Sequence, residues 1–224
     1  MEDKMGKKKI FIYGDSNTHG ADEEHAGRFD ENTRWTGVCQ NFLGDEYEII
    51  AEGLSGRTTC HDDDGTLPLP EAPYINGLKH IGPIVCSHLP LDMIVVKLGA
   101  NDVGLPGETP ESIAENAARV LRRARDLMEA KYPGRPFKCA LFAPLEITED
   151  AMTGAFSFVF GDPALVEQSK QLPAAYEKKA AEEGWLYFDG NKFARCGKWD
   201  GIHLDAENHR KMGEAAAEWF KENI

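Results

Sequence analysis

Three residues that are far apart in the sequence have the side chains that acyl transfer requires. Ser16 lies in IFIYGDSNTHG (residues 10–20), and Asp200 and His203 lie in WDGIH near the carboxyl end. A serine hydroxyl becomes a strong nucleophile when an imidazole takes its proton and a carboxylate orients that imidazole. Asp200 and His203 are three positions apart, near enough for the carboxylate to meet one ring nitrogen. We therefore expect Ser16, His203 and Asp200 to form a catalytic triad.

Two further fragments carry groups that could stabilise an oxyanion. A tetrahedral intermediate of acyl transfer needs hydrogen-bond donors for its negatively charged oxygen. Gly56, in EGLSGRTT, can offer a backbone N–H with no side chain in the way, and Asn101, in GAND, can offer its side-chain amide. The backbone N–H of Ser16 is the third donor. We expect Ser16, Gly56 and Asn101 to form an oxyanion hole.

Four more residues beside these fragments are candidates for substrate binding: Asp15, Asn17, Arg57 and Trp199. Each has an alternative role. Asp15 could cap a helix, and Trp199 could pack beside the Asp–His loop. Arg57 could anchor a polar substrate group or pair with Asp62 or Asp63.

Apolar stretches before the fragments predict the strands that must position them. The stretches are 8–13, 47–51, 91–98, 137–143 and 186–188. Residues 91–98 (LDMIVVKL) are almost continuously apolar, as in a parallel strand that is covered on both faces. In an open α/β sheet, ligands bind beyond the carboxyl ends of the strands. The fragments with Ser16, Gly56, Asn101 and His203 all fall at such ends, so the topology should gather them on one edge.

Helical spacing of apolar residues fills the gaps between the strands. It predicts helices at 33–43 with Thr33 as its cap, at 110–131, at 163–183 with a kink at Pro173, and at 205–222 with Asp205 as its cap. Alternating strands and helices indicate right-handed βαβ units in a doubly wound α/β sheet. We expect one domain over residues 1–224.

Two segments without a predicted element, 53–74 and 144–162, are unusually long for such a fold and could carry function. In the second, Phe156, Phe158 and Phe160 alternate like one face of a strand. They could line an acyl pocket, form an oligomer contact or simply pack.

The fragments GDSNTHG, EGLSGRTT, GAND and DGIH resemble, in this order, the four sequence blocks of the SGNH (GDSL) hydrolases. RWTG (34–37) and HLPLD (88–92) are similar to features of the bacterial arylesterase and acyltransferase branch. The resemblance extends over about residues 8–220. It implies a three-layer, flavodoxin-like, five-stranded parallel sheet with helices on both faces. It also implies the same triad and the same oxyanion hole that the residue types suggest.

Members of this family hydrolyse short acyl and aryl esters, and some transfer the acyl group to alcohols or peroxide. The resemblance thus implies a small-molecule ester substrate, no cofactor, and a homo-oligomer in which neighbouring subunits narrow the site mouth. This chain has Asn17 where Leu is usual, and His19 where a bulkier apolar or aromatic residue is usual. We expect both differences to affect acyl-chain preference rather than the chemistry.

Composition and missing motifs exclude several other functions. The net charge of −13 argues against nucleic-acid binding, and no apolar run is long enough to span a membrane. Five cysteines without paired spacing indicate reduced thiols and a cytoplasmic protein. The chain has no G-x-S-x-G elbow, P-loop, HExxH or paired CxxC. The spacing of His203 and His209 is unsuitable for a metal pair, so we expect no metal.

The sequence therefore predicts a serine esterase that cleaves short acyl or aryl esters through an acyl-enzyme, with acyl transfer left open. The alternative is a carbohydrate acetyl esterase with the same triad. A non-catalytic binding module of the same fold, with Ser16 only a helix cap, is disfavoured because the triad and oxyanion residues form a complete set.

Overall fold

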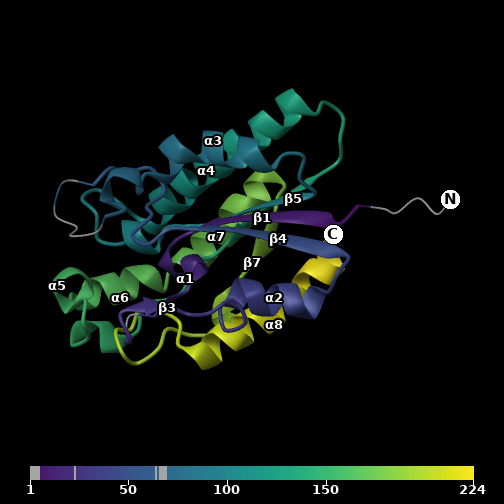
Figure 1. Cartoon of the computed structure of the whole chain (residues 1–224). Helices are drawn as coiled ribbons and strands as arrows, with labels where there is room; N and C mark the ends of the chain where they lie inside the picture. Colours follow the sequence, from purple (N-terminus) through teal and green to yellow (C-terminus); the bar gives the residue numbers. More distant parts are fainter. Residues whose placement is uncertain (1–5, 23, 64, 66–69) are drawn as a thin grey trace.

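The computed structural model describes residues 6–22, 24–63, 65 and 70–224. Its centre is a parallel sheet of five strands in the order β4–β1–β5–β6–β7 (Figure 1). These strands are β1 (Lys8–Gly14), β4 (Tyr47–Gly53), β5 (Met93–Lys97), β6 (Lys138–Phe142) and β7 (Leu186–Phe188). The chain starts in the interior of the sheet and runs outwards first to one side and then to the other, as in flavodoxin-like folds.

Helices cover both faces of this sheet, so the predicted three-layer α/β class is confirmed (Figure 1). One face packs against α2 (Trp35–Leu43) and α8 (Ala206–Asn223), and the other against α3 (Gly77–His88), α4 (Pro110–Lys131) and α7 (Leu172–Glu183). The separation follows from strand alternation: in β1, Ile10 and Ile12 face the α2–α8 side, whereas Phe11 and Tyr13 face the α3–α4–α7 side.

Shorter elements connect these layers. They are α1 (Ser16–His19), β2 (Ala21–Asp22), β3 (Gly27–Arg28), η1 (Ala72–Tyr74), η2 (Ala100–Asp102), η3 (Glu149–Met152), α5 (Ser157–Phe160), α6 (Pro163–Ser169) and η4 (Gly190–Lys192). β2 and β3 form a small antiparallel pair. α1, α5 and α6 lie toward the end of the molecule opposite the carboxyl terminus (Figure 1). The carboxyl end of β1 leads directly into this region.

The predicted strands are confirmed to within two residues at each end, and the 110–131 helix has the bounds that its sequence predicts. The single kinked helix over 163–183 is wrong, because α6 and α7 are separate helices. Pro173 lies in the first turn of α7, where its missing N–H costs no helical hydrogen bond. Helix α3 has no counterpart in the sequence analysis, since Pro83 lies inside it.

One of the two predicted helix caps is confirmed and the other is wrong. Asp205 caps α8 as expected, accepting a hydrogen bond from the backbone N–H of Asn208. Thr33 does not cap α2: its hydroxyl donates to Asp30, and Arg34 occupies the N-cap position without a side-chain bond.

The two long segments contain more structure than the sequence indicates. In 53–74, residues 64 and 66–69 lie outside the described part of the chain. In 144–162, η3 and α5 make the backbone partly helical. The strand-like reading of the phenylalanines in this segment is therefore wrong.

Lys97, the last residue of β5, is completely buried, and its ammonium has no hydrogen-bond partner within the described part of the chain. Burying an unpaired polar or charged group is costly. We therefore predict that Lys97→Met, which keeps the length of the side chain but removes the ammonium, raises the free energy of unfolding by about 1–3 kcal/mol.

Denaturant unfolding of the wild type and the variant measures this difference. Lys192→Met, which changes an exposed lysine in η4, is the matched control and should change stability little. A lower stability of Lys97→Met would show that the buried ammonium makes a favourable interaction.

Candidate active site

Ser16 is presented by a tight turn between β1 and α1. The strand ends at Gly14, and Asp15 caps the helix by accepting a hydrogen bond from the Asn17 backbone N–H at 3.0 Å. A Cβ on Gly14 would lie only 2.1 Å from Oγ1 of Thr18, so a side chain at this position would push α1 away from the strand. The turn leaves Ser16 6% exposed. Asp15 is 1% exposed and therefore acts as a cap rather than as the substrate contact that the sequence suggests.

The structure brings Ser16, His203 and Asp200 together at this turn. Oγ of Ser16 lies 2.8 Å from Nε2 of His203, and Oδ2 of Asp200 lies 2.6 Å from Nδ1 of the same ring. The other oxygen of Asp200 accepts hydrogen bonds from the backbone N–H groups of Ile202 and His203, at 2.8 and 2.9 Å. The carboxylate is thus fixed on two sides and holds the imidazole between itself and the hydroxyl.

The electrostatics of this site keep Asp200 ionised. Burial tends to raise the pKa of its carboxyl group, but the hydrogen bond and charge interaction with His203, together with the two backbone N–H groups, lower the pKa below its usual value. An ionised Asp200 can stabilise an imidazolium that forms on His203.

Asn17 holds the loop that carries His203. Its Nδ2 donates to the carbonyl of Ile202 at 3.1 Å, and its Oδ1 accepts from the backbone N–H of Leu204 at 2.8 Å. These two bonds flank His203 on both sides along the chain. Asn17 is 2% exposed and does not line a cavity with Ser16. Asn17 therefore does not make the substrate contact that the sequence suggests. It is a positioning residue that holds the loop carrying His203 against the turn carrying Ser16.

The three expected oxyanion donors line one cavity of about 850 Å³, which we call the serine cavity. Ser16, Gly56 and Asn101 all contribute to its wall, from the ends of β1, β4 and β5. Gly56 has a φ of +73°, a conformation that glycine adopts without strain. Nδ2 of Asn101 donates one hydrogen bond to the carbonyl of Arg57 at 3.0 Å, and its second N–H has no partner among the described residues.

Arg57, the residue after Gly56, is buried and does not line the serine cavity. Its guanidinium lies 4.0 Å from the centre of the Tyr13 ring and donates to the carbonyls of Gly14 and Glu52, at 2.7 and 2.5 Å. The expected substrate anchor is therefore a structural cation. It does not pair with Asp62 either, since that carboxylate binds Lys79.

Asp102 is a site residue that the sequence analysis did not single out. It is completely buried, and its carboxylate accepts hydrogen bonds from the backbone N–H and the hydroxyl of Thr59. Burial raises the pKa of Asp102 to about 6, although the bonds from Thr59 oppose this rise. The contact joins the Gly56 segment to the Asn101 segment and so fixes two sides of the expected oxyanion hole. In the sequence, its position directly after Asn101 in GAND is the signal that could have identified Asp102 as a site residue.

Aromatic and aliphatic side chains form much of the remaining wall of the serine cavity. Phe156, Phe158 and Phe160 all line it. The ring of Phe156 contacts that of His203, with 5.7 Å between their centres, while Phe158 is 74% exposed at the surface. Of the roles left open by the sequence, lining a pocket therefore applies to all three, and Phe160 also packs into the core.

Trp199 and His209 lie outside the serine cavity. Trp199 is 52% exposed and lines a second cavity on the other side of the Asp–His loop. His209 is completely buried, accepts a hydrogen bond from the Trp35 backbone N–H at 3.2 Å, and has its pKa lowered to about 3, chiefly by burial. Within the described ranges, no group of three or more His, Cys, Asp or Glu residues could hold a metal ion.

Comparison with known proteins places this geometry in context. The model of the GDSL-like lipase/acylhydrolase family matches residues 12–211. Among solved structures, Est24, a carbohydrate acetylesterase from Sinorhizobium meliloti, is 30% identical with a TM-score of 0.83, covering 97% of this chain and 100% of its own. An aryl esterase from M. smegmatis is 28% identical with a TM-score of 0.84 and the same coverage. A putative arylesterase from Agrobacterium tumefaciens is 32% identical with a TM-score of 0.79, again with this coverage.

No curated protein sequence matches the chain. Among the helices of the described residues, none is both long and apolar enough to cross a bilayer.

The bonds of Asn17 generate a test of its positioning role. Asn17→Ala removes both bonds to the histidine loop, so we expect the imidazole to lose its alignment with Ser16. The turnover number on p-nitrophenyl acetate should fall by about 10–100-fold with little change in KM, because a small misplacement at the reacting centre costs about this much.

Asn41→Ala is the matched control, since Asn41 is an exposed asparagine on α2 whose amide donates a hydrogen bond to the side chain of Asn32. A variant with unchanged kcat would show that the loop keeps its position without Asn17.

Proposed function

Because the chain belongs to the GDSL-like lipase/acylhydrolase (SGNH) family and is a carboxylic ester hydrolase, we propose that it cleaves short acyl and aryl esters through an acyl-enzyme on Ser16. The observation that carries this proposal is the position of His203. Its two ring nitrogens lie 2.8 Å from Oγ of Ser16 and 2.6 Å from Oδ2 of Asp200. This is the arrangement that activates a serine hydroxyl.

In the first half of the proposed reaction, His203 takes the proton of Ser16 while Oγ attacks the ester carbonyl carbon. Asp200 stabilises the resulting imidazolium. The negative charge on the former carbonyl oxygen is stabilised by the amide of Asn101 and the backbone N–H groups of Ser16 and Gly56. Neither of these backbone groups has a hydrogen-bond partner within the described residues, so both are free to donate.

The second half follows by proton transfers through the same imidazole. His203 gives its proton to the departing alcohol oxygen, and the C–O bond of the ester breaks to leave an acyl group on Ser16. His203 then takes a proton from water while the water oxygen attacks the acyl carbon. The bond from the acyl carbon to Oγ breaks, His203 returns the proton to Oγ, and the acid leaves. An alcohol that enters in place of water would yield a new ester, so acyl transfer is the competing outcome of this step.

The size and lining of the serine cavity support binding of a small-molecule ester with an apolar group. At about 850 Å³ the cavity is of ordinary size for a small-molecule site, and its phenylalanine wall favours apolar groups. Cleavage of acetylated carbohydrates by the same triad is the second candidate. It is favoured by the likeness to Est24, whose description names it a carbohydrate acetylesterase.

The cellular setting is also a proposal. We infer a cytoplasmic location from the five cysteines, all of which are free thiols. We infer a homo-oligomer because Phe158 and Val159 are 74% and 41% exposed beside the serine cavity, where a second copy of the chain could cover them.

Replacement of the nucleophile tests the proposed function. Ser16→Ala should reduce the turnover of p-nitrophenyl acetate by roughly 10³-fold or more, leaving only the contribution of the oxyanion donors and of binding. Ser87→Ala, at an exposed serine on α3 whose hydroxyl donates to the Pro83 carbonyl in the same helix, is the control. Near-wild-type hydrolysis by Ser16→Ala would refute the assignment.

A further inference from the structure

His61 forms a second pair of imidazole and carboxylate, in the wall of the serine cavity. Its Nε2 lies 2.7 Å from Oε1 of Glu108 and 3.8 Å from Oδ1 of Asp102. The side chains of Glu108 and Asp102 are both buried, whereas the side chain of His61 is 35% exposed. Two buried carboxylates therefore hold one edge of a ring that also lines the cavity of Ser16.

The other contacts of Glu108 indicate which nitrogen of His61 carries a proton. Oε1 of Glu108 also accepts a hydrogen bond from the amide of Asn116 at 3.0 Å, and Oε2 accepts one from the hydroxyl of Ser112. A carboxylate has only acceptors, so Nε2 of His61 donates to it. In the neutral imidazole, Nδ1 is then the acceptor. Nδ1 has no hydrogen-bond partner among the described residues and remains accessible to a small ligand.

His61 lies on the oxyanion side of the serine cavity. It follows Gly56 by five residues, and its ring contacts Asp102, the neighbour of Asn101. In the proposed mechanism, the former carbonyl oxygen is held by Gly56 and Asn101, whereas the alcohol oxygen lies beside His203, which protonates it as it leaves.

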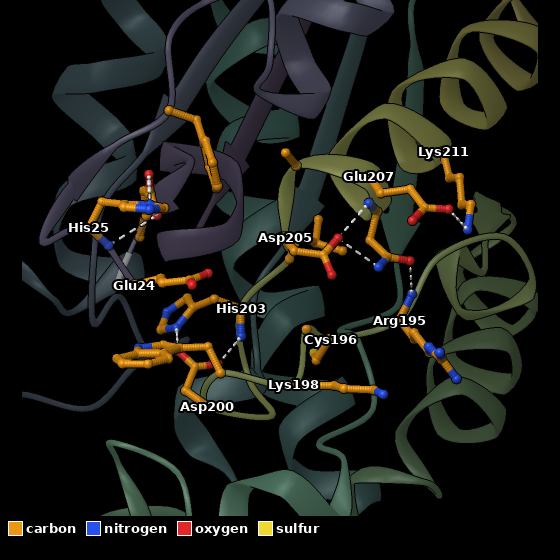
Figure 2. A pocket seen from close by; sticks show the side chains of 18 residues that line it. Glu24, His25, Arg195, Cys196, Lys198, Asp200, His203, Asp205, Glu207 and Lys211 are labelled. Carbon is orange, nitrogen blue, oxygen red and sulfur yellow. Dashed lines mark hydrogen bonds and ion pairs between the residues drawn. The ribbon is translucent and has the colours of Figure 1, made fainter.

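The alcohol half of the ester extends from His203. The ring of Phe156 contacts that of His203 within the serine cavity, and His203 together with Asp200 also lines a second cavity of about 750 Å³ (Figure 2). His61 lines the serine cavity but not this second one. The acyl substituent is therefore the part of the ester that lies nearest to His61.

We propose that His61 selects esters whose short acyl chain carries a hydroxyl group, an inference that rests on the proposed function. The hydroxyl donates a hydrogen bond to Nδ1 of the neutral ring. If the ring is protonated, Nδ1 becomes a donor and the same hydroxyl accepts. A hydroxyl thus suits both forms of His61, whereas a methyl group in its place leaves Nδ1 without a partner.

The charges of the serine cavity disfavour an anionic acyl group. Apart from its two histidines, the ionisable residues that line the cavity in the described part of the chain are Asp62, Asp63 and Glu71. A carboxylate on the acyl chain would meet these like charges, and no lysine or arginine among the described lining residues offsets them. A neutral hydroxyl avoids this repulsion.

The experiment compares p-nitrophenyl esters in two pairs. The first pair is the 2-hydroxypropanoate and the 2-methylpropanoate, and the second is the 3-hydroxybutanoate and the 3-methylbutanoate. Within each pair, a hydroxyl replaces a methyl group of similar size, and all four esters release the same alcohol. The measured quantity is the hydroxyl ratio, which is kcat/KM for the hydroxy ester divided by kcat/KM for its methyl partner, after subtraction of spontaneous hydrolysis.

The variants His61→Leu and His61→Phe both remove the ring nitrogens but differ in bulk. Both should lower the hydroxyl ratio of at least one pair by about twofold to tenfold, the value of one hydrogen bond between neutral groups. Partial misfolding lowers both rates equally and cancels in the ratio.

His88→Leu is the matched control. Nε2 of His88 bonds to Oε1 of Glu52 at 2.9 Å, so this residue is also a histidine paired with a glutamate, but it lines neither cavity. The hydroxyl ratios of His88→Leu should equal those of the wild type.

The results that would overturn the proposal can be told apart from failure of the proposed function. If the wild type cleaves the four esters but both His61 variants keep its hydroxyl ratios, His61 does not bind the acyl hydroxyl and the esterase proposal stands. A fall in only one of the two variants would indicate an effect of bulk and would equally reject the hydrogen bond. If the wild type cleaves none of the esters, the proposed function fails and this inference fails with it.

Discussion

The whole site depends on one hydrogen bond between residues that are 187 positions apart, the contact of Ser16 Oγ with His203 Nε2. A hydroxyl and an imidazole on two separate loops would not keep this distance by themselves. Asn17 provides the constraint, because its side chain bonds to the backbone on both sides of His203. The residue beside Ser16 thereby fixes the position of the His203 imidazole, and movement of one loop carries the other with it.

Close backbone packing around α1 and the Asp200 loop maintains the same constraint. A Cβ on Gly53, at the end of β4, would lie 2.1 Å from the backbone nitrogen of His19 in α1. On the far side, a Cβ on Gly154 would lie 2.7 Å from the Cα of Asp200. Gly201, with a φ of +73°, packs in the same manner against Ala151. Because these glycines lack side chains, neighbouring backbone segments pack in direct contact. The turn at Ser16 and the loop with Asp200 and His203 therefore have little freedom to separate.

Strand periodicity and carboxyl-end placement are local signals, so the sequence predicts the sheet and the meeting of Ser16, Asp200 and His203 at one of its edges. It was misleading where a role depends on a distant partner. Asn17 and Arg57 look like substrate contacts from their neighbours in the chain, yet both bind backbone groups across the fold. Asp102 was missed for the same reason, since its partner Thr59 lies in another segment. Helix α3 was missed because Pro83 interrupts its pattern.

Labelling with a fluorophosphonate, followed by intact mass measurement and peptide mapping, tests most directly whether His203 activates Ser16. The predicted result is a single adduct on Ser16 that forms rapidly in the wild type and at least about a hundredfold more slowly in His203→Ala. Equal labelling rates in the two proteins, or an adduct on a different residue, would contradict the account.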